Sequence, residues 1–397
     1  MAFKRFKKKK KPKGVVLPEN PTSVEDYGYK WLKLDADSEH EKYDYKLVDM
    51  KSNGKFKFID QEHYEAISEM VKNYIQEVMA KDFDLQVHNL PLEEDYPEGY
   101  PKVPIFVSKN YDTADKLLLL IQGLGQVRAG QWARSLCINE DLSKGSILPY
   151  LVEARSRGYA IIVFNPNKNE GRVKNRMVQI RHNKSPENHA CYVYDKFVAS
   201  SKAKDVVIIA HSYGGIATLN LLYQKDELLS RLRCVALTDS VHPRLWSRNK
   251  QRFDEELLDY YDKNVCNWVR STRPVGTPRK KEGGCPTVSA GHTEHEWTSA
   301  ASIDSVWDYI DAKVSGKEVN VTPSKKSKKQ KKGNKKNKDT SEKPKNDEAK
   351  EKEEKSQEEE ENDDKGGKED DNNVETTKDE DTEEEEENGK KSEKTSE

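Results

Sequence analysis

The stretch VVIIAHSYGGIATLNLL, residues 206–222, constrains the fold of this chain more than any other. Four apolar residues lead into AHSYGG, and an apolar pattern typical of a helix follows. When a strand turns sharply into a helix with a serine at the apex, the residues two before and two after that serine must be small. Ala210 and Gly214 meet this condition, in an A-x-S-x-G version of the usual G-x-S-x-G. The stretch therefore predicts a nucleophile elbow at Ser212.

Apolar runs typical of buried strands alternate with helical patterns on both sides of this elbow. The predicted strands are 116–123, 159–167, 205–212, 234–240 and 285–291, the last an edge strand because it contains a proline. The predicted helices include residues 64–78, 147–157, 215–224 and 303–314, and another begins at Ser185-Pro186. This alternation predicts an α/β fold, with a mostly parallel sheet and helices on both faces.

A serine hydroxyl becomes a good nucleophile only when a base takes its proton. In this kind of fold the catalytic groups follow the order serine, acid, histidine. Asp239 ends the strand after the elbow, and His295 precedes the last helix, so Ser212, Asp239 and His295 preserve the order. His292 and His242 are alternative bases, and the acid of such folds often comes one strand later than Asp239.

Acyl transfer also needs backbone N–H groups that stabilise an oxyanion. The residue after the nucleophile, Tyr213, is one predicted donor. The loop after an earlier strand supplies the other, and Gly123 and Leu124 in IQGLGQ are its candidates. Gln122 stands there in place of the histidine of many hydrolases.

Charge is segregated along the chain, although the formal net charge is only -2. The N-terminus, MAFKRFKKKKKPKG, carries only basic charges, and a lysine-rich stretch gives way to acidic runs at the C-terminus. From residue 323 onward the only aliphatic residues are Ala349 and Val374, too few to offset the entropy of ordering the segment. We therefore predict a disordered basic segment at 1–17, one α/β domain at 18–316 and a disordered charged tail at 317–397. The lysine-rich ends either contact RNA non-specifically or only add solubility.

Several other classes of protein are disfavoured. The N-terminus lacks the apolar stretch of a signal peptide, and no segment approaches the ~18 apolar residues of a membrane span. Five scattered cysteines without a C-x-x-C pair suggest neither a disulfide framework nor a structural zinc site, and fit the nucleus or cytosol. GLGQVRAG lacks the Gly-Lys-Ser/Thr of a phosphate loop, and H-x-x-H in a loop is a weak metal motif. No cofactor or metal is expected.

Several segments together resemble the argonaute-binding, Arb-type domain family, among them RAGQW, INEDL, VVIIAHSYGG, VALTDSVH and VSAGHTEHEWTS. The resemblance implies an α/β-hydrolase-like fold with the family's nucleophile at Ser212 and its histidine at His295. It also implies association with Argonaute and chromatin factors, in heterochromatin formation or cotranscriptional splicing control, in the nucleus with a cytoplasmic pool left open. Gln122-Gly123 departs from the His-Gly of animal relatives.

Two functions follow from these observations. The first is a nuclear regulator that associates with Argonaute. The second is a serine hydrolase acting on an ester, thioester or amide, for which a pseudoenzyme that keeps the elbow for packing is the alternative, because a fold does not determine a function.

Overall fold

The computed structural model describes residues 17–34, 42–94, 96–243, 253–281 and 283–317. All of them belong to the first of two compact units, Met1–Lys326 and Ser327–Glu397. The segments expected to be disordered, 1–17 and 317–397, lie outside the described residues except for Leu17 and Lys317.

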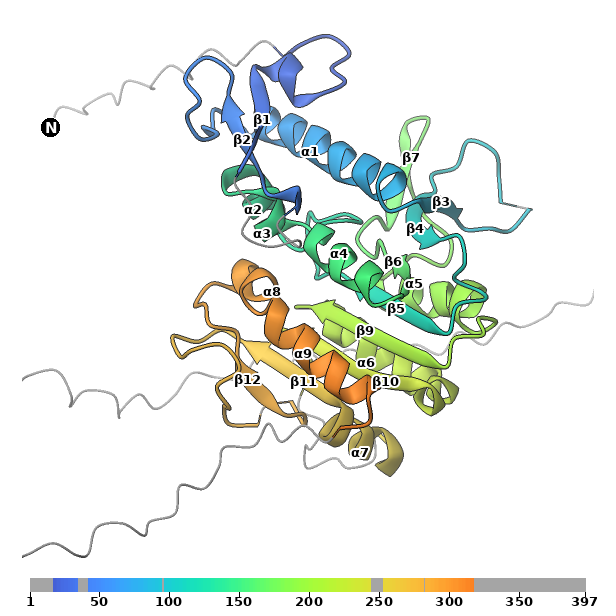
Figure 1. The fold of residues 1–397 in the computed structure, drawn as a ribbon. Helices are drawn as coiled ribbons and strands as arrows, with labels where there is room; N and C mark the ends of the chain where they lie inside the picture. The colour runs from blue at the N-terminus through green and yellow to red at the C-terminus, as the bar shows by residue number, and fades with distance from the viewer. Residues whose placement is uncertain (1–16, 35–41, 95, 244–252, 282, 318–397) are drawn as a thin grey trace, which may run out of the picture. The chain divides into compact units, whose positions relative to one another are not determined.

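An eight-stranded sheet forms the centre of this domain (Figure 1), in the order β12-β11-β10-β9-β5-β6-β4-β3. Its strands are β3 (Leu85–Leu90), β4 (Val103–Ser108), β5 (Lys116–Ile121), β6 (Ala160–Val163), β9 (Asp205–His211), β10 (Leu232–Thr238), β11 (Val265–Val269) and β12 (Thr287–Ser289). The strands from β6 to β12 are parallel, whereas β4 pairs antiparallel with both β3 and β6. With β5 and β6 exchanged relative to chain order, this is the strand order of an α/β-hydrolase-like sheet.

The sheet separates two apolar cores because its central strands are apolar on both faces. In β5, Leu118 and Leu120 belong to one core, and Leu117 and Leu119 belong to the other. All four side chains are fully buried. Both faces must therefore be covered by helices, as the sequence predicts.

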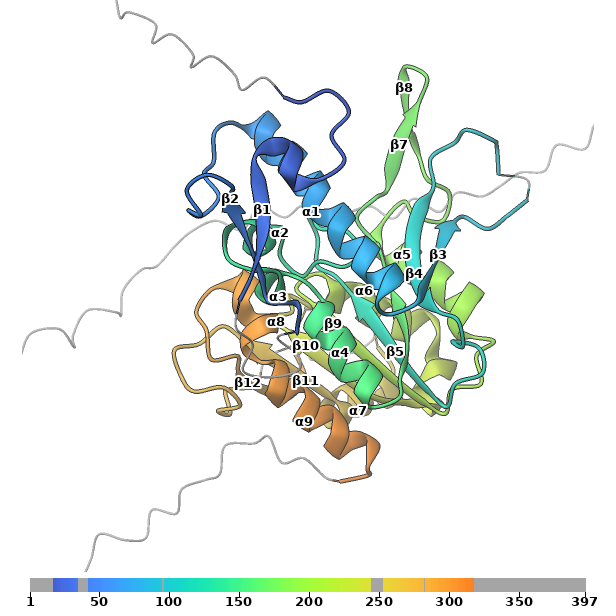
Figure 2. The ribbon, with the colours of Figure 1, turned by 45° about the horizontal axis from the view of Figure 1, so that its top comes forward.

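Helices cover both faces (Figures 1 and 2). The first core includes residues of α1 (Gln61–Lys81), α4 (Leu148–Ser156) and α9 (Ile303–Val314). The second includes residues of α5 (Pro186–Val193), η3 (Tyr194–Val198), α6 (Gly214–Gln224) and α7 (Glu255–Asn264). Shorter elements complete the domain: η1 (Val24–Tyr27), α2 (Arg134–Asn139), α3 (Leu142–Gly145), η4 (Asp226–Ser230), η5 (His295–Trp297) and α8 (Thr298–Ala301).

Two small hairpins stand outside the large sheet. They are β1 (Tyr29–Lys33) with β2 (Tyr45–Asp49), and β7 (Glu170–Val173) with β8 (Arg176–Gln179). The second hairpin is inserted between β6 and α5, after the carboxyl end of β6. It therefore starts from the same edge of the sheet as the elbow after β9.

The fold class and the predicted strands and helices are confirmed. β12 is the edge strand that Pro286 indicates. α5 begins as its sequence predicts, since the Ser185 hydroxyl accepts a hydrogen bond from the backbone N–H of Asn188 at 3.3 Å. Among the residues that the structure describes, the helices are too short or too polar to span a membrane.

Candidate active site

Ser212 occupies a sharp turn between β9, which ends at His211, and α6, which begins at Gly214. Its φ is 53°, in the left-handed region that is uncommon for non-glycine residues. A β-carbon at Gly214 would lie 2.5 Å from the carbonyl oxygen of Ile121. One at Gly215 would overlap the Ser240 hydroxyl. Only glycine at these two positions lets α6 approach the sheet closely enough to form the elbow.

Asp239 follows β10 and is hydrogen-bonded to His295, with Nδ1 of the histidine 2.6 Å from Oδ2 of the carboxylate. Asp239 is itself held in the left-handed region, at φ 45°, and its N–H donates to the carbonyl of Trp268 at 2.7 Å. Burial acts to raise the pKa of the Asp239 carboxyl, but hydrogen bonds from His295 and Arg270 outweigh it and lower the pKa. The carboxylate is therefore charged at neutral pH.

Arg270 is a second partner of this carboxylate. Its Nε lies 2.8 Å from Asp239 Oδ2, and its backbone N–H donates to Oδ1 at 3.2 Å. Arg270 directly follows β11, the strand after which such folds often place their acid. Here that position carries the cation, and the acid that contacts the histidine comes one strand earlier.

The structure distinguishes between the three candidate histidines. His242 is buried against Ser240, with Nδ1 2.8 Å from its hydroxyl, and burial lowers the pKa of His242 to about 4. His292 accepts a hydrogen bond from the N–H of Glu294 at 3.1 Å and stacks on Trp297. Of the three, only His295 contacts Asp239 within the described part of the chain.

The ring of His211, the residue before Ser212, packs against His295. The two imidazole rings lie 4.7 Å apart. Burial lowers the pKa of His211 to about 3, so this ring stays neutral beside a base that must accept a proton. Because Asp239 holds Nδ1 of His295, Nε2 is the nitrogen that can serve Ser212. The described residues show no hydrogen bond between Ser212 and His295; such bonds often tighten only when substrate binds.

The predicted oxyanion loop lies directly against the nucleophile. A β-carbon at Gly123 would lie 2.8 Å from that of Ser212, so only glycine fits there without displacing the elbow. The side-chain amide of Asn167 donates to the Gly123 carbonyl at 2.6 Å and fixes the loop. Leu124 is 60% exposed. Tyr213 directly precedes α6, and its carbonyl accepts hydrogen bonds from the N–H groups of Ile216 and Ala217 in the first turn. The donor roles of Gly123, Leu124 and Tyr213 stay predictions.

Sequence reasoning missed three residues of this site: Arg270, His211 and Asn167. Arg270 follows a strand that the sequence did not reveal, and His211 was read only as part of the elbow motif. Asn167 stands only at the end of the predicted strand 159–167. Gln122, which stands where many hydrolases have a histidine, is almost fully buried. Neither its amide nitrogen nor its amide oxygen has a hydrogen-bond partner among the described residues.

The fold and this site define an α/β-hydrolase-like protein with a nucleophile elbow. Residues 35–275 match the Arb2 domain, so the chain belongs to the Arb2 domain family. It is 35% identical over 317 residues to the "Cotranscriptional regulator ARB2A homolog" of Xenopus tropicalis, covering 67% of this chain and 74% of that protein. It is 34% identical over 316 residues to the "Cotranscriptional regulator ARB2A" of Homo sapiens, again with 67% and 74% coverage.

Two solved structures show more distant similarity. The "Structure of the histone deacetylase Clr3" is 16% identical, with a TM-score of 0.43, over 66% of this chain and 41% of that one. The "Bacterial Heroin Esterase" is 16% identical, with a TM-score of 0.35, over 66% and 95%. The fold assignment rests on the strand order and the elbow rather than on these values.

Proposed function

We propose that this protein is a nuclear cotranscriptional regulator of the Arb2 family that carries a serine hydrolase site. The regulatory part is supported by its similarity to proteins named cotranscriptional regulators, at about a third identity over three quarters of their length. The finer role that we propose is association with Argonaute and chromatin-associated factors, in heterochromatin formation or splicing control. Membership of the Arb2 family supports this role.

Association with Argonaute is tested by pull-down with purified Argonaute and the full chain, beside variants that lack residues 1–17 or 318–397. The α/β domain matches the family, so we expect both truncated variants to retain Argonaute. Loss of capture in either one would assign the contact to a charged end instead. Failure of the full chain to capture Argonaute would refute the proposed partner.

The hydrolase part is supported by one observation above all: Ser212 is held at φ 53° beside a His295–Asp239 hydrogen bond of 2.6 Å. In the proposed reaction the Ser212 oxygen attacks the acyl carbon while His295 Nε2 takes the hydroxyl proton. Asp239 stabilises the imidazolium that forms, and N–H groups of the loop at Gly123 and of Tyr213 bind the oxyanion. His295 then protonates the leaving group, and water activated by His295 hydrolyses the acyl-enzyme.

This activity is tested with p-nitrophenyl esters of increasing chain length. Ser212→Ala and His295→Ala should each abolish turnover, while Ser230→Ala, a change of an exposed serine outside the elbow, leaves it unchanged. Turnover that survives in Ser212→Ala would show that another group hydrolyses the ester.

A further inference from the structure

The β7–β8 hairpin concentrates positive charge outside the candidate active site. Residues 168–184 contain six lysines and arginines and a single acidic residue, Glu170. Arg172, Lys174 and Arg176 are exposed on the hairpin and form no ion pair with the described residues. Figure 2 shows the hairpin projecting beyond the neighbouring loops. Three exposed cations thus lie near the turn of the hairpin. In the β7–β8 register Arg172 pairs with Met177 and Val173 with Arg176, so the two arginines lie on opposite faces.

The base of the hairpin is fixed rather than loosely tethered. A β-carbon at Gly171 would overlap the ring of Pro101, so β7 packs directly on the loop before β4. Ile180 is fully buried, and its N–H donates to the carbonyl of Asn169 at 2.8 Å. The Asn169 side chain donates in turn to the carbonyl of Asn183 at 2.8 Å. The cations are therefore presented in a defined position.

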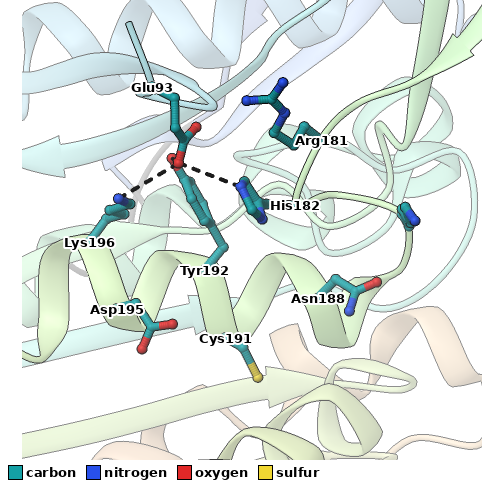
Figure 3. A pocket seen from close by; sticks show the side chains of 9 residues that line it. Glu93, Arg181, His182, Asn188, Cys191, Tyr192, Asp195 and Lys196 are labelled. Atoms are coloured by element: carbon teal, nitrogen blue, oxygen red, sulfur yellow. Dashed lines mark hydrogen bonds and ion pairs between the residues drawn. The ribbon is translucent and has the colours of Figure 1, made fainter. Parts of the chain in front are cut away.

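A cavity of about 630 Å³ opens at this base, where the chain leaves β8 and enters α5 (Figure 3). Its lining includes Arg181, His182, Lys184, Tyr192, Lys196 and Glu93. The His182 and Tyr192 rings are stacked, 4.6 Å apart and nearly parallel at 4°, and His182 Nε2 lies 3.5 Å from Glu93 Oε1. A volume in this range, about 300–1,000 Å³, is typical of small-ligand sites and admits one nucleotide.

Charge in the cavity is positive on balance. Asp195 on its wall is already paired with Lys225, at 2.7 Å. Glu93 Oε1 accepts a hydrogen bond from Tyr192 at 2.9 Å, and the same oxygen lies 3.7 Å from Lys196. The other carboxylate oxygen, Oε2, is buried without a hydrogen-bond partner among the described residues. The cavity is therefore basic and aromatic. Lys184 in its lining forms no ion pair with the described residues.

We propose that the β7–β8 hairpin and the cavity at its base form a binding surface for single-stranded nucleic acid. The hairpin cations contact phosphates, and an unpaired base enters the cavity, where it stacks on the outer face of the His182–Tyr192 pair. Aromatic stacking combined with a basic track is how proteins hold single strands. An acidic protein segment would use the cations but not the stacked rings. This function is independent of Ser212.

The test is fluorescence anisotropy of the full chain with a labelled single-stranded RNA of about 20 nucleotides, across a salt series. The hairpin variant is Arg172→Gln, Lys174→Gln, Arg176→Gln. The matched control, Lys51→Gln, Lys57→Gln, Lys280→Gln, removes three charges from exposed lysines elsewhere. Because both variants keep the lysine-rich ends, their difference reports the hairpin alone. Thermal melting confirms that both remain folded.

The hairpin variant should bind the RNA about tenfold more weakly or worse. Its plot of log affinity against log salt should be shallower by about 2, at about 0.7 for each phosphate that the variant no longer neutralises. The control variant should stay within about twofold of wild type. His182→Ala should weaken single-strand binding about fivefold or more without changing the salt slope, because it removes a stacked ring rather than a lysine or arginine. Single-stranded DNA of the same sequence and duplex RNA identify the preferred strand.

Three results would overturn the proposal. The first is wild-type protein that does not bind either single strand. The second is equal weakening in the hairpin and control variants, which would make binding a matter of net charge. The third is displacement of the RNA by polyglutamate as readily as by unlabelled RNA, which would mark a surface for acidic proteins. Loss of Ser212 activity in the separate ester assay would leave this proposal standing.

Discussion

His295 and Arg270 both contact the same carboxylate oxygen of Asp239, Oδ2, and their roles differ. His295 needs the carboxylate to hold its Nδ1–H and to stabilise its charged form, whereas Arg270 only supplements the charge from a half-exposed position. Loss of the Asp239 carboxylate, which holds His295, should therefore lower turnover far more than loss of Arg270, which only neutralises Asp239.

We accordingly predict that Asp239→Asn lowers kcat/KM for an ester by about 10³–10⁴-fold, because the amide favours the wrong tautomer of His295. Arg270→Gln should lower it less than about tenfold, the loss of a half-exposed ion pair. Steady-state kinetics of the two variants side by side test this. Equal losses would mean that Arg270, and not the His295 contact, makes Asp239 effective.

The elbow depends on how closely α6 approaches the end of β5. Gly214→Ala should destabilise the domain by about 2–4 kcal/mol, since the added β-carbon meets the carbonyl oxygens of Ile121 and Gln122, which are backbone atoms that cannot move aside cheaply. Gln224→Ala, an exposed change on the same helix, should stay within about 0.5 kcal/mol of wild type. Urea unfolding measures both, and a tolerated Gly214→Ala would show that the elbow relaxes.

Elements with a strong apolar pattern could be predicted from the sequence, and elements without one could not. β5, β6, β9 and β10 are nearly continuous apolar runs buried on both faces. β3, LQVHNL, is largely exposed along its middle, and β11 carries Asn267 between its apolar residues. The β7–β8 hairpin has no buried side of its own. The local pattern of apolar residues indicates which segments are buried. It therefore does not identify strands that are polar or stabilised only by long-range pairing.

The site shows the same division. Chain order alone paired Asp239 with His295, because parallel strands end at one edge of the sheet and the loops after β10 and β12 meet there. Arg270 could not be placed, since β11 was not recognised and its carboxyl end therefore had no predicted location. The packing of His211 against His295 depends on side-chain geometry that no spacing encodes.

At the scale of the whole domain, buried neutral histidines make stability depend on pH. Burial lowers the pKa of His189 and of His211 to about 3, and that of His242 to about 4, from an ordinary 6.5. Below pH 6.5 these histidines bind protons in the unfolded chain but stay neutral in the folded chain. The contribution of these histidines to the free energy of unfolding is thus complete above pH 6.5. It is lost progressively as the pH falls towards their folded-state pKa values.

We expect the free energy of unfolding to fall between pH 7 and pH 5 by about 2 kcal/mol for each of these histidines. Urea unfolding at the two pH values measures the total, and His189→Gln should reduce the pH-dependent loss by about 2 kcal/mol. A variant with an unchanged pH dependence would show that His189 is protonated in the folded protein.

Whether Ser212 is an activated nucleophile is tested most directly by covalent labelling of the purified full chain with a fluorophosphonate probe. Wild type, Ser212→Ala and His295→Ala are compared, and circular dichroism confirms that all three are folded. The geometry of the elbow and of the His295–Asp239 pair predicts rapid labelling of wild type, none in Ser212→Ala and strongly slowed labelling in His295→Ala. A folded wild type that the probe does not label would contradict the account and identify the elbow as a packing device of a pseudoenzyme.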